Sequence, residues 1–171
     1  MKKTIATVLL IFALFVFTSC SEQGDDQKQL QTNIPFTCTV NFDYDSLSAQ
    51  GKLTYRNAAS CTFELLSPSA VEGVIFEFDG EQITAQYKGI SFAILDTNAQ
   101  AVTAAKLIFS SLAGAETEKN TQDDGNEFLI RGETDSVNYE LRFDKISGYV
   151  KSLSAKSLNF SAEFKDFKFL E

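Results

Sequence analysis

The stretch GVIFEFDGEQITAQY, residues 73–87, decides the fold class of this chain. Apolar residues recur at every second position on both sides of Asp79-Gly80, which is the pattern of two half-buried strands. Asp-Gly is typical of a two-residue type I′ turn, because this turn needs positive φ at both central positions. The predicted antiparallel register pairs, counting away from the turn, Phe78 with Glu81, Phe76 with Ile83, Val74 with Ala85 and Glu72 with Tyr87.

The same period of two residues continues on both sides of this hairpin. Apolar positions mark further strands within residues 36–42, 53–55, 61–65, 90–94, 128–130, 139–141 and 160–164. A weaker strand begins at residue 150. Phe128 and Ile130 are expected to oppose Tyr139 and Leu141 across a loop near Thr134-Asp135. The pattern therefore predicts a mainly β (α+β) domain with an antiparallel sheet of about ten strands.

One segment changes from strand spacing to helical spacing. Thr97 and Gln100 form a capping box, and Gly114 is expected to end the helix. Between them, apolar residues recur on one helical face: Ala101, Ala104, Ala105, Ile108, Phe109 and Leu112. We predict one amphipathic helix of about four turns. The polar residues 115–126 that follow are expected to form a mobile surface loop.

The first nineteen residues have the features of a secretory signal. Lys2 and Lys3 are basic, residues 5–17 are apolar, and small residues lead to Cys20. The apolar stretch is shorter than the ~20 residues that a membrane helix needs. Phe17-Thr18-Ser19-Cys20 resembles the bacterial lipobox, in which the Cys is acylated and becomes the new N-terminus, although Phe17 replaces the usual Leu. We therefore expect residues 1–19 to be removed and Cys20 to be acylated.

The segment after the lipobox contains almost no apolar side chain except Leu30. Residues 20–33 are therefore expected to be a lipidated, flexible polar tether with an r.m.s. reach of ~20 Å. Acyl chains on Cys20 would hold the exported protein on the outer surface of the cell membrane, or on the outer membrane of a cell that has two. Residues 34–171 are predicted to form the single folded domain.

The composition excludes several kinds of chemistry. A chain without His has no Ser-His-Asp triad, no Cys-His pair and no imidazole metal site. Loss of Lys2 and Lys3 leaves 13 of the 15 basic residues against 23 acidic ones, a net charge of −10, so nucleic acid is not an expected partner. No glycine spacing matches a phosphate-binding loop. A Ser-Lys hydrolase pairing stays open, but we expect a monomeric protein that is not an enzyme and needs no cofactor.

Two smaller groups of residues have alternative interpretations. Asp123, Asp124, Asn126 and Glu127 could coordinate calcium, but they lack the alternating ligands of an EF-hand, so a solvated loop is favoured. Cys38 and Cys61 could form a disulfide in an exported protein. In a simple meander, however, Cys38 lies opposite Tyr55 and Tyr55 opposite Cys61, which places the thiols ~9.6 Å apart, beyond the ~7 Å limit. Two buried free thiols are expected.

Several segments together resemble bacterial lipoproteins of the LolA/LolB-like superfamily, over roughly Ile34 to Phe169. They are the lipobox and tether, FTCTV at 36–40, GVIFEFDG at 73–80, YKGISF at 87–92, and DKISG at 144–148 before a final Phe-rich strand. The resemblance implies a strongly curved antiparallel half-barrel with a helical lid over an apolar cavity. It also implies a role in carrying acyl chains or lipoproteins. No ligand-contacting residue is transferred, because no functional motif aligns.

The predicted sheet is much wider than one helix, which leaves two alternatives for how the space between them is filled. About ten strands span ~48 Å, whereas one helix is ~10 to 12 Å in diameter. Either the sheet curls so that its many Phe side chains fill the interior, or an apolar groove stays open beneath the helix. The first alternative describes a non-catalytic structural or accessory lipoprotein of the cell envelope, and the second a binding protein for a lipid or another amphiphile. The predicted lining of the groove is Phe36, Val40, Leu53, Val74, Phe76 and Ile83 from the sheet and Ala105, Ile108 and Leu112 from the helix.

Overall fold

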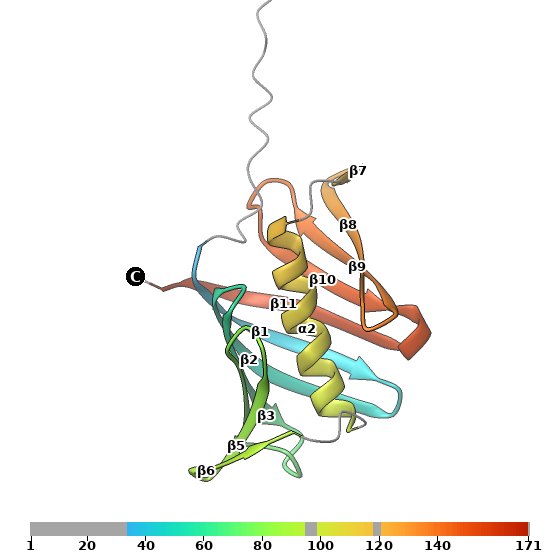
Figure 1. The fold of residues 1–171 in the computed structure, drawn as a ribbon. Helices are drawn as coiled ribbons and strands as arrows, with labels where there is room; N and C mark the ends of the chain where they lie inside the picture. The colour runs from blue at the N-terminus through green and yellow to red at the C-terminus, as the bar shows by residue number, and fades with distance from the viewer. Residues whose placement is uncertain (1–33, 95–98, 118–120, 171) are drawn as a thin grey trace, which may run out of the picture.

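The computed structural model describes residues 34–94, 99–117 and 121–170. Eleven strands form one antiparallel sheet in the order β6-β5-β4-β3-β2-β1-β11-β10-β9-β8-β7. The sheet is strongly curved, and helix α2 (Gln100–Thr117) lies across its concave face (Figure 1). The predicted fold class, a mainly β half-barrel with one helix, is confirmed. The predicted signal segment and tether, residues 1–33, lie outside the described residues.

The strands form two meanders that meet at the centre of the sheet. The first meander consists of β1 (Phe36–Tyr44), β2 (Leu47–Asn57), β3 (Ser60–Ser67), β4 (Val74–Phe78), β5 (Ile83–Tyr87) and β6 (Ile90–Ala93). The second consists of β7 (Gln122–Asp124), β8 (Glu127–Thr134), β9 (Val137–Asp144), β10 (Val150–Ala155) and β11 (Phe160–Phe169), with the short 3-10 helix η2 (Lys156–Leu158) between the last two. Pairing of β1 with β11 joins the meanders, and α2 connects β6 to β7.

The hairpin at Asp79-Gly80 forms, but its predicted register is wrong by two residues. Phe78 pairs with Ile83, Phe76 with Ala85 and Val74 with Tyr87. Instead of a two-residue turn, residues 79–82 form a wider loop, because the Asp79 carboxylate accepts hydrogen bonds from the backbone N–H of Glu81 (3.0 Å) and Gln82 (2.8 Å). Since two is the period of a strand, the same apolar residues still face the concave side.

The second predicted hairpin forms from β8 and β9. Its turn is Asp135-Ser136, and both residues have positive φ, 48° and 64°. Ile130 pairs with Leu141 and Phe128 with Phe143, while Tyr139 faces Gly132. On the convex side, Arg131 donates a hydrogen bond to Glu140 at 3.0 Å. The hairpin is thus confirmed, but its turn lies one residue later than predicted, so that Phe128 opposes Phe143 instead of Tyr139 or Leu141.

The predicted end of the helix at Gly114 is wrong, because α2 continues to Thr117. A Cβ at Gly114 would lie 2.6 Å from the hydroxyl oxygen of Tyr139, so the glycine permits a close approach of α2 to β9. Near the same end of α2, the hydroxyl of Tyr55 donates to Glu116 at 2.6 Å and ties the helix to β2. Residues 122–124 form the edge strand β7, so the prediction of a loop over all of 115–126 is also wrong.

The two described cysteines are buried and free, as predicted. The register around Cys38 differs from the prediction, because Cys38 faces Leu53 and Tyr55 faces Phe36, yet β2 still separates Cys38 from Cys61. Burial raises the pKa of the Cys38 thiol, and burial together with the charge of Glu116 raises the pKa of the Cys61 thiol to about 12. Both thiols therefore stay protonated near neutral pH and act as small apolar core groups.

Candidate ligand-binding groove

The concave face of the sheet is packed solid beneath the middle of α2. Val40, Leu53, Ala105 and Ile108 have no exposed surface, and Leu112 is 2% exposed. Toward the end of α2, a gap bounded by Phe36, Tyr55, Leu112 and Phe143 has a volume of ≈ 10 Å³, too little for a ligand. The small side chains of α2 let the helix approach the sheet closely, so that Phe and Leu side chains fill the space between them. The filled-interior alternative thus describes the centre of the domain.

An open groove lies at the beginning of α2, where the helix passes over the first meander. Its volume is ≈ 370 Å³, within the range of roughly 300–1,000 Å³ that is usual for ligand pockets. The sheet contributes Leu65, Val74, Phe76, Ala85 and Phe92. The helix and the neighbouring loops contribute Val71, Ile94, Ala99, Ala101 and Val102. Every side chain named here is apolar.

The groove exists because the last strands of this meander extend past the part of the sheet that α2 covers. Strands β4, β5 and β6 are short, with five, five and four residues, and they curve away at one end of the helix (Figure 1). Ala85 on the sheet and Ala101 on the helix are small, which leaves space between them. At 5.8 Å between ring centroids, Phe78 stacks on Phe109 and fixes the helix to β4.

Two of the nine residues predicted to bind a ligand, Val74 and Phe76, line this groove. Ile83 is half-buried and packs against the core. The other six lie in the packed core beneath the helix: Phe36, Val40, Leu53, Ala105, Ile108 and Leu112. A role in ligand binding stays a prediction for all nine. Sequence reasoning did not identify the helix-start side of the groove. Ala99 and Ala101 are small, but so are Ala104 and Ala105 in the packed core, so residue size does not distinguish the two places.

Exposed apolar side chains continue from the groove to the edge of the sheet. Phe92, which lines the groove, is 49% exposed, and Ile90 on the same strand is 70% exposed. Tyr87 pairs with Ile90 across the β5–β6 hairpin, so the two side chains share a face. The ammonium group of Lys88 lies 5.1 Å from the Tyr87 ring centroid. The apolar surface therefore ends beside a cation at the solvent.

A second cavity lies on the other side of α2, between the helix and the β8–β9 turn. It has a volume of ≈ 290 Å³ and includes Tyr44, Leu107, Val137 and Leu158. Its wall also contains the ion pair of Lys106 with Asp135, at 2.5 Å. Because an apolar ligand would have to lie against this charged pair, the all-apolar groove is the better candidate for a lipid site.

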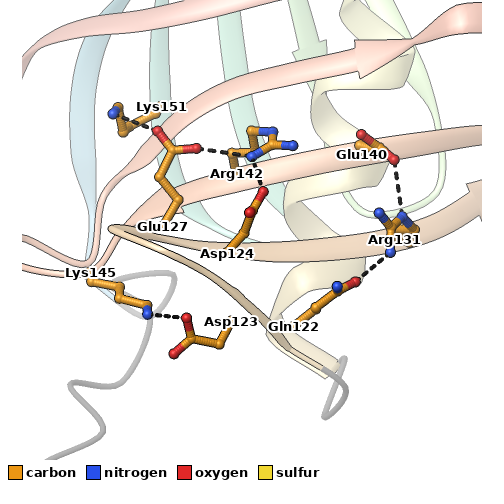
Figure 2. Close-up of polar contacts among 9 residues, drawn as sticks. All are labelled: Gln122, Asp123, Asp124, Glu127, Arg131, Glu140, Arg142, Lys145 and Lys151. Carbon is orange, nitrogen blue, oxygen red and sulfur yellow. Dashed lines mark hydrogen bonds and ion pairs between the residues drawn. The ribbon is translucent and has the colours of Figure 1, made fainter.

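The acidic residues considered for calcium are paired with basic side chains in Figure 2. Arg142 contacts Asp124 at 2.7 Å and Glu127 at 3.1 Å, and Lys151 contacts Glu127 at 2.6 Å. Hydrogen bonds from Lys151 and Arg142 lower the pKa of Glu127, and the bond from Lys151 has the larger effect. Asp123 forms an ion pair with Lys145. Over the described parts of the chain, no group of three or more Cys, Asp or Glu residues is placed to hold a metal ion.

No protein-family model and no curated protein matches the sequence. Among solved structures, an uncharacterized conserved protein from Thermus thermophilus is similar, with a TM-score of 0.52 and 10% identity over 84% of this chain and 85% of that chain. This similarity shows a shared fold. The similar structures also include the LolA superfamily protein NE2245 from Nitrosomonas europaea, with a TM-score of 0.49 and 10% identity over 85% of this chain and 93% of that chain. In the described segments, no helix is both long and apolar enough to cross a membrane.

Proposed function

We propose that this protein is an exported lipoprotein, acylated at Cys20, whose half-barrel binds the apolar part of a lipid or another amphiphile. The observation that carries the proposal is the open groove at the start of α2, which is lined by apolar side chains. Apolar surface of this extent is costly to leave in water, at about 25 cal/mol for each Å². An acyl chain would remove it from water without requiring any polar partner. No catalytic residue and no cofactor are needed for this function.

The exposed edge of the groove favours an amphiphile over a wholly apolar molecule. A tail that lies on Phe76 and Ala85 would leave past Phe92, which is half exposed. The polar end of the ligand would then stay in water, near the ammonium group of Lys88. Such a site binds by burial of the tail and accepts different head groups. The sequence resemblance to LolA/LolB-like lipoproteins supports the same class of ligand, acyl chains or lipoproteins.

A second function is favoured by the packed centre of the domain. Because Val40, Leu53, Ala105 and Ile108 beneath the middle of α2 have no exposed surface, the core there is complete without a ligand. On this alternative the protein is a structural or accessory lipoprotein of the cell envelope. Saturable uptake of a fluorescent fatty acid by residues 21–171 separates the two functions, since only the binding protein takes up the probe.

The proposed anchor depends on one residue, because Cys20 is the only Cys within the lipobox-like segment. Replacing Cys20 with Ser is expected to abolish metabolic labelling with a radioactive fatty acid. The protein should then leave the membrane fraction or accumulate as an unprocessed precursor, because its acyl chains are what hold it there. The buried Cys38→Ser variant is the matched control and should be labelled like the wild type. Acyl label on the Cys20→Ser protein would contradict the proposed anchor.

A further inference from the structure

Aromatic side chains gather at the end of the sheet where the described chain begins. Ring centroids of Phe36 and Phe167 are 5.3 Å apart, those of Tyr149 and Phe167 are 5.0 Å apart, and those of Tyr149 and Phe169 are 5.4 Å apart. We call these four residues the aromatic rim. Phe36 is 5% exposed, whereas Phe169 at the other end of the series is 50% exposed. The rim thus has a buried base and an exposed tip.

Two exposed aliphatic residues accompany the rim. Ile34, the first described residue, is 41% exposed, and Ile146 is 76% exposed. The backbone N–H of Leu170 donates to the carbonyl of Pro35 at 3.0 Å, so the first and last described residues lie together at this end. Ile146 belongs to the turn just before Tyr149, which the Asp144 carboxylate holds by accepting hydrogen bonds from the backbone N–H of Ile146 (3.1 Å) and Ser147 (2.8 Å).

A β-bulge in β11 brings the last two Phe residues to this face. Phe160, Ala162 and Phe164 are buried on the concave side, so an uninterrupted strand would place residues 167 and 169 on the convex side. The register with β1 shifts between Thr37, which pairs with Lys168, and Thr39, which pairs with Lys165. Asp166 has a φ of 56° there and supplies the extra residue. The bulge therefore turns Phe167 and Phe169 toward Phe36 and Tyr149, at the cost of a left-handed residue.

We propose that the aromatic rim is a membrane-contacting surface that inserts Phe169 and Ile146 into the interfacial region of a lipid bilayer. The position of the rim supports this occupant, because the described part of the chain begins beside it at Ile34, and the proposed anchor at Cys20 lies only 14 residues earlier in the sequence. Aromatic side chains favour the boundary between acyl chains and head groups. Acidic residues outnumber basic ones by 23 to 15, so burial of the rim, and not attraction to anionic lipids, would drive the contact.

This orientation fixes where the groove lies relative to the bilayer. Leu112, near the end of α2, borders the same small gap as Phe36 and Phe169, whereas Ala101 and Val102 at the helix start line the groove. Residues 101 and 112 are separated by about 16 Å along a helix. With its rim in the membrane, the domain therefore holds the groove on the side away from the bilayer.

The test uses two features of the composition, the absence of Trp and the absence of His. A hexahistidine tag in place of residues 1–20 attaches the protein to vesicles of brominated phosphatidylcholine and a nickel-chelating lipid, without acylation. The described strands, helix and core all lie between Ile34 and Leu170, so this replacement leaves their contacts unchanged. Phe169→Trp supplies the reporter, Ile146→Trp a second reporter, and Leu66→Trp the matched control at an exposed apolar site on the face of the sheet opposite the groove.

Bromine on the acyl chains quenches only a Trp that reaches them. We expect Trp emission at positions 169 and 146 to shift to the blue and to be quenched at least about twofold more than at position 66. Equal quenching at all three positions would overturn the proposal. A blue shift at position 169 that grows with protein concentration in the absence of vesicles would also overturn it, because a second copy of the chain would then be the occupant. Since the tag replaces the acyl anchor, failure of the lipoprotein proposal is detected separately, by the Cys20→Ser experiment.

Discussion

Replacing Ala101 with phenylalanine is expected to weaken the binding of a fluorescent fatty acid at least about tenfold, equivalent to ~1.4 kcal/mol. Ala101 is half-buried and lines the groove on its helix side. A phenyl ring at this position would extend into the ≈ 370 Å³ that the acyl chain is proposed to occupy. Because the groove is open to solvent, the added side chain can be accommodated without displacing the packed core. Titration of the probe into residues 21–171 measures the effect.

The matched control for Ala101→Phe is Ala113→Phe. Ala113 is also half-buried on α2, but it lies toward the other end of the helix and does not line the groove. The control variant should bind the probe like the wild type, and circular dichroism should show that both variants keep the fold. Wild-type affinity in Ala101→Phe, or an equal loss in Ala113→Phe, would contradict the assignment of the groove as the binding site.

Replacing Phe63 with alanine is expected to lower the free energy of unfolding by about 3–5 kcal/mol. Phe63 has no exposed surface, and its ring lies 5.9 Å from that of Phe42, measured between centroids. The Phe63 ring also packs so closely on Gly51 of the neighbouring strand that a Cβ at this glycine would clash with it. Truncation would therefore leave a cavity and uncover the glycine backbone. This is a large loss, because the total free energy of unfolding of a protein is typically about 5–15 kcal/mol.

Urea unfolding of Phe63→Ala and of Leu66→Ala provides the comparison. Leu66 lies on the same strand but is 39% exposed, on the opposite face from Phe63. Its truncation should change the free energy of unfolding by about 0.5 kcal/mol or less. If the two variants unfold at the same urea concentration, the concave face is not the core of the domain.

The strands were predictable because each buries one face. Along β1, buried and half-buried residues alternate from Phe36 to Phe42, and this period of two residues is visible in the sequence. The edge strand β7 was not predictable in this way, because its three residues are all exposed and polar. It is instead placed by pairing with β8 and by side chains such as Arg142, which contacts Asp124. The contact with Arg142 joins residues 18 apart in the sequence, and β7 itself has no apolar alternation, so the local pattern does not reveal this strand.

Turn chemistry predicted where the chain reverses better than it predicted register. Asp79-Gly80 does mark a hairpin, but the Asp79 side chain stabilises a four-residue loop by bonding to the N–H groups after it. Gly114 was predicted to end the helix, which is a common place for glycine. In the structure, Gly114 instead lies against the hydroxyl of Tyr139. This contact depends on how α2 and β9 pack, which the local sequence does not show.

The position of the groove depends on packing, which the sequence pattern does not determine. Ala105 in the middle of α2 was predicted to line the groove, but Ala104 and Ala105 have no exposed surface because the helix lies directly on the sheet. The space is found instead near Ala101, where the short strands β4 to β6 curve away from the helix. Val74 and Phe76 were predicted to line the groove because they lie on the concave face of this part of the sheet.

The central claim is that the groove holds an amphiphile, and its most direct test is analysis of what the purified protein contains. Residues 21–171 are expressed in a bacterium, purified without detergent, extracted with organic solvent and analysed by mass spectrometry. We predict a lipid or another amphiphile in the extract of the wild type and of Ala113→Phe, and its depletion in Ala101→Phe. The claim would be contradicted if folded wild-type protein released no amphiphile and took up no fatty-acid probe. The alternative function, an accessory lipoprotein with a filled core, would then be favoured.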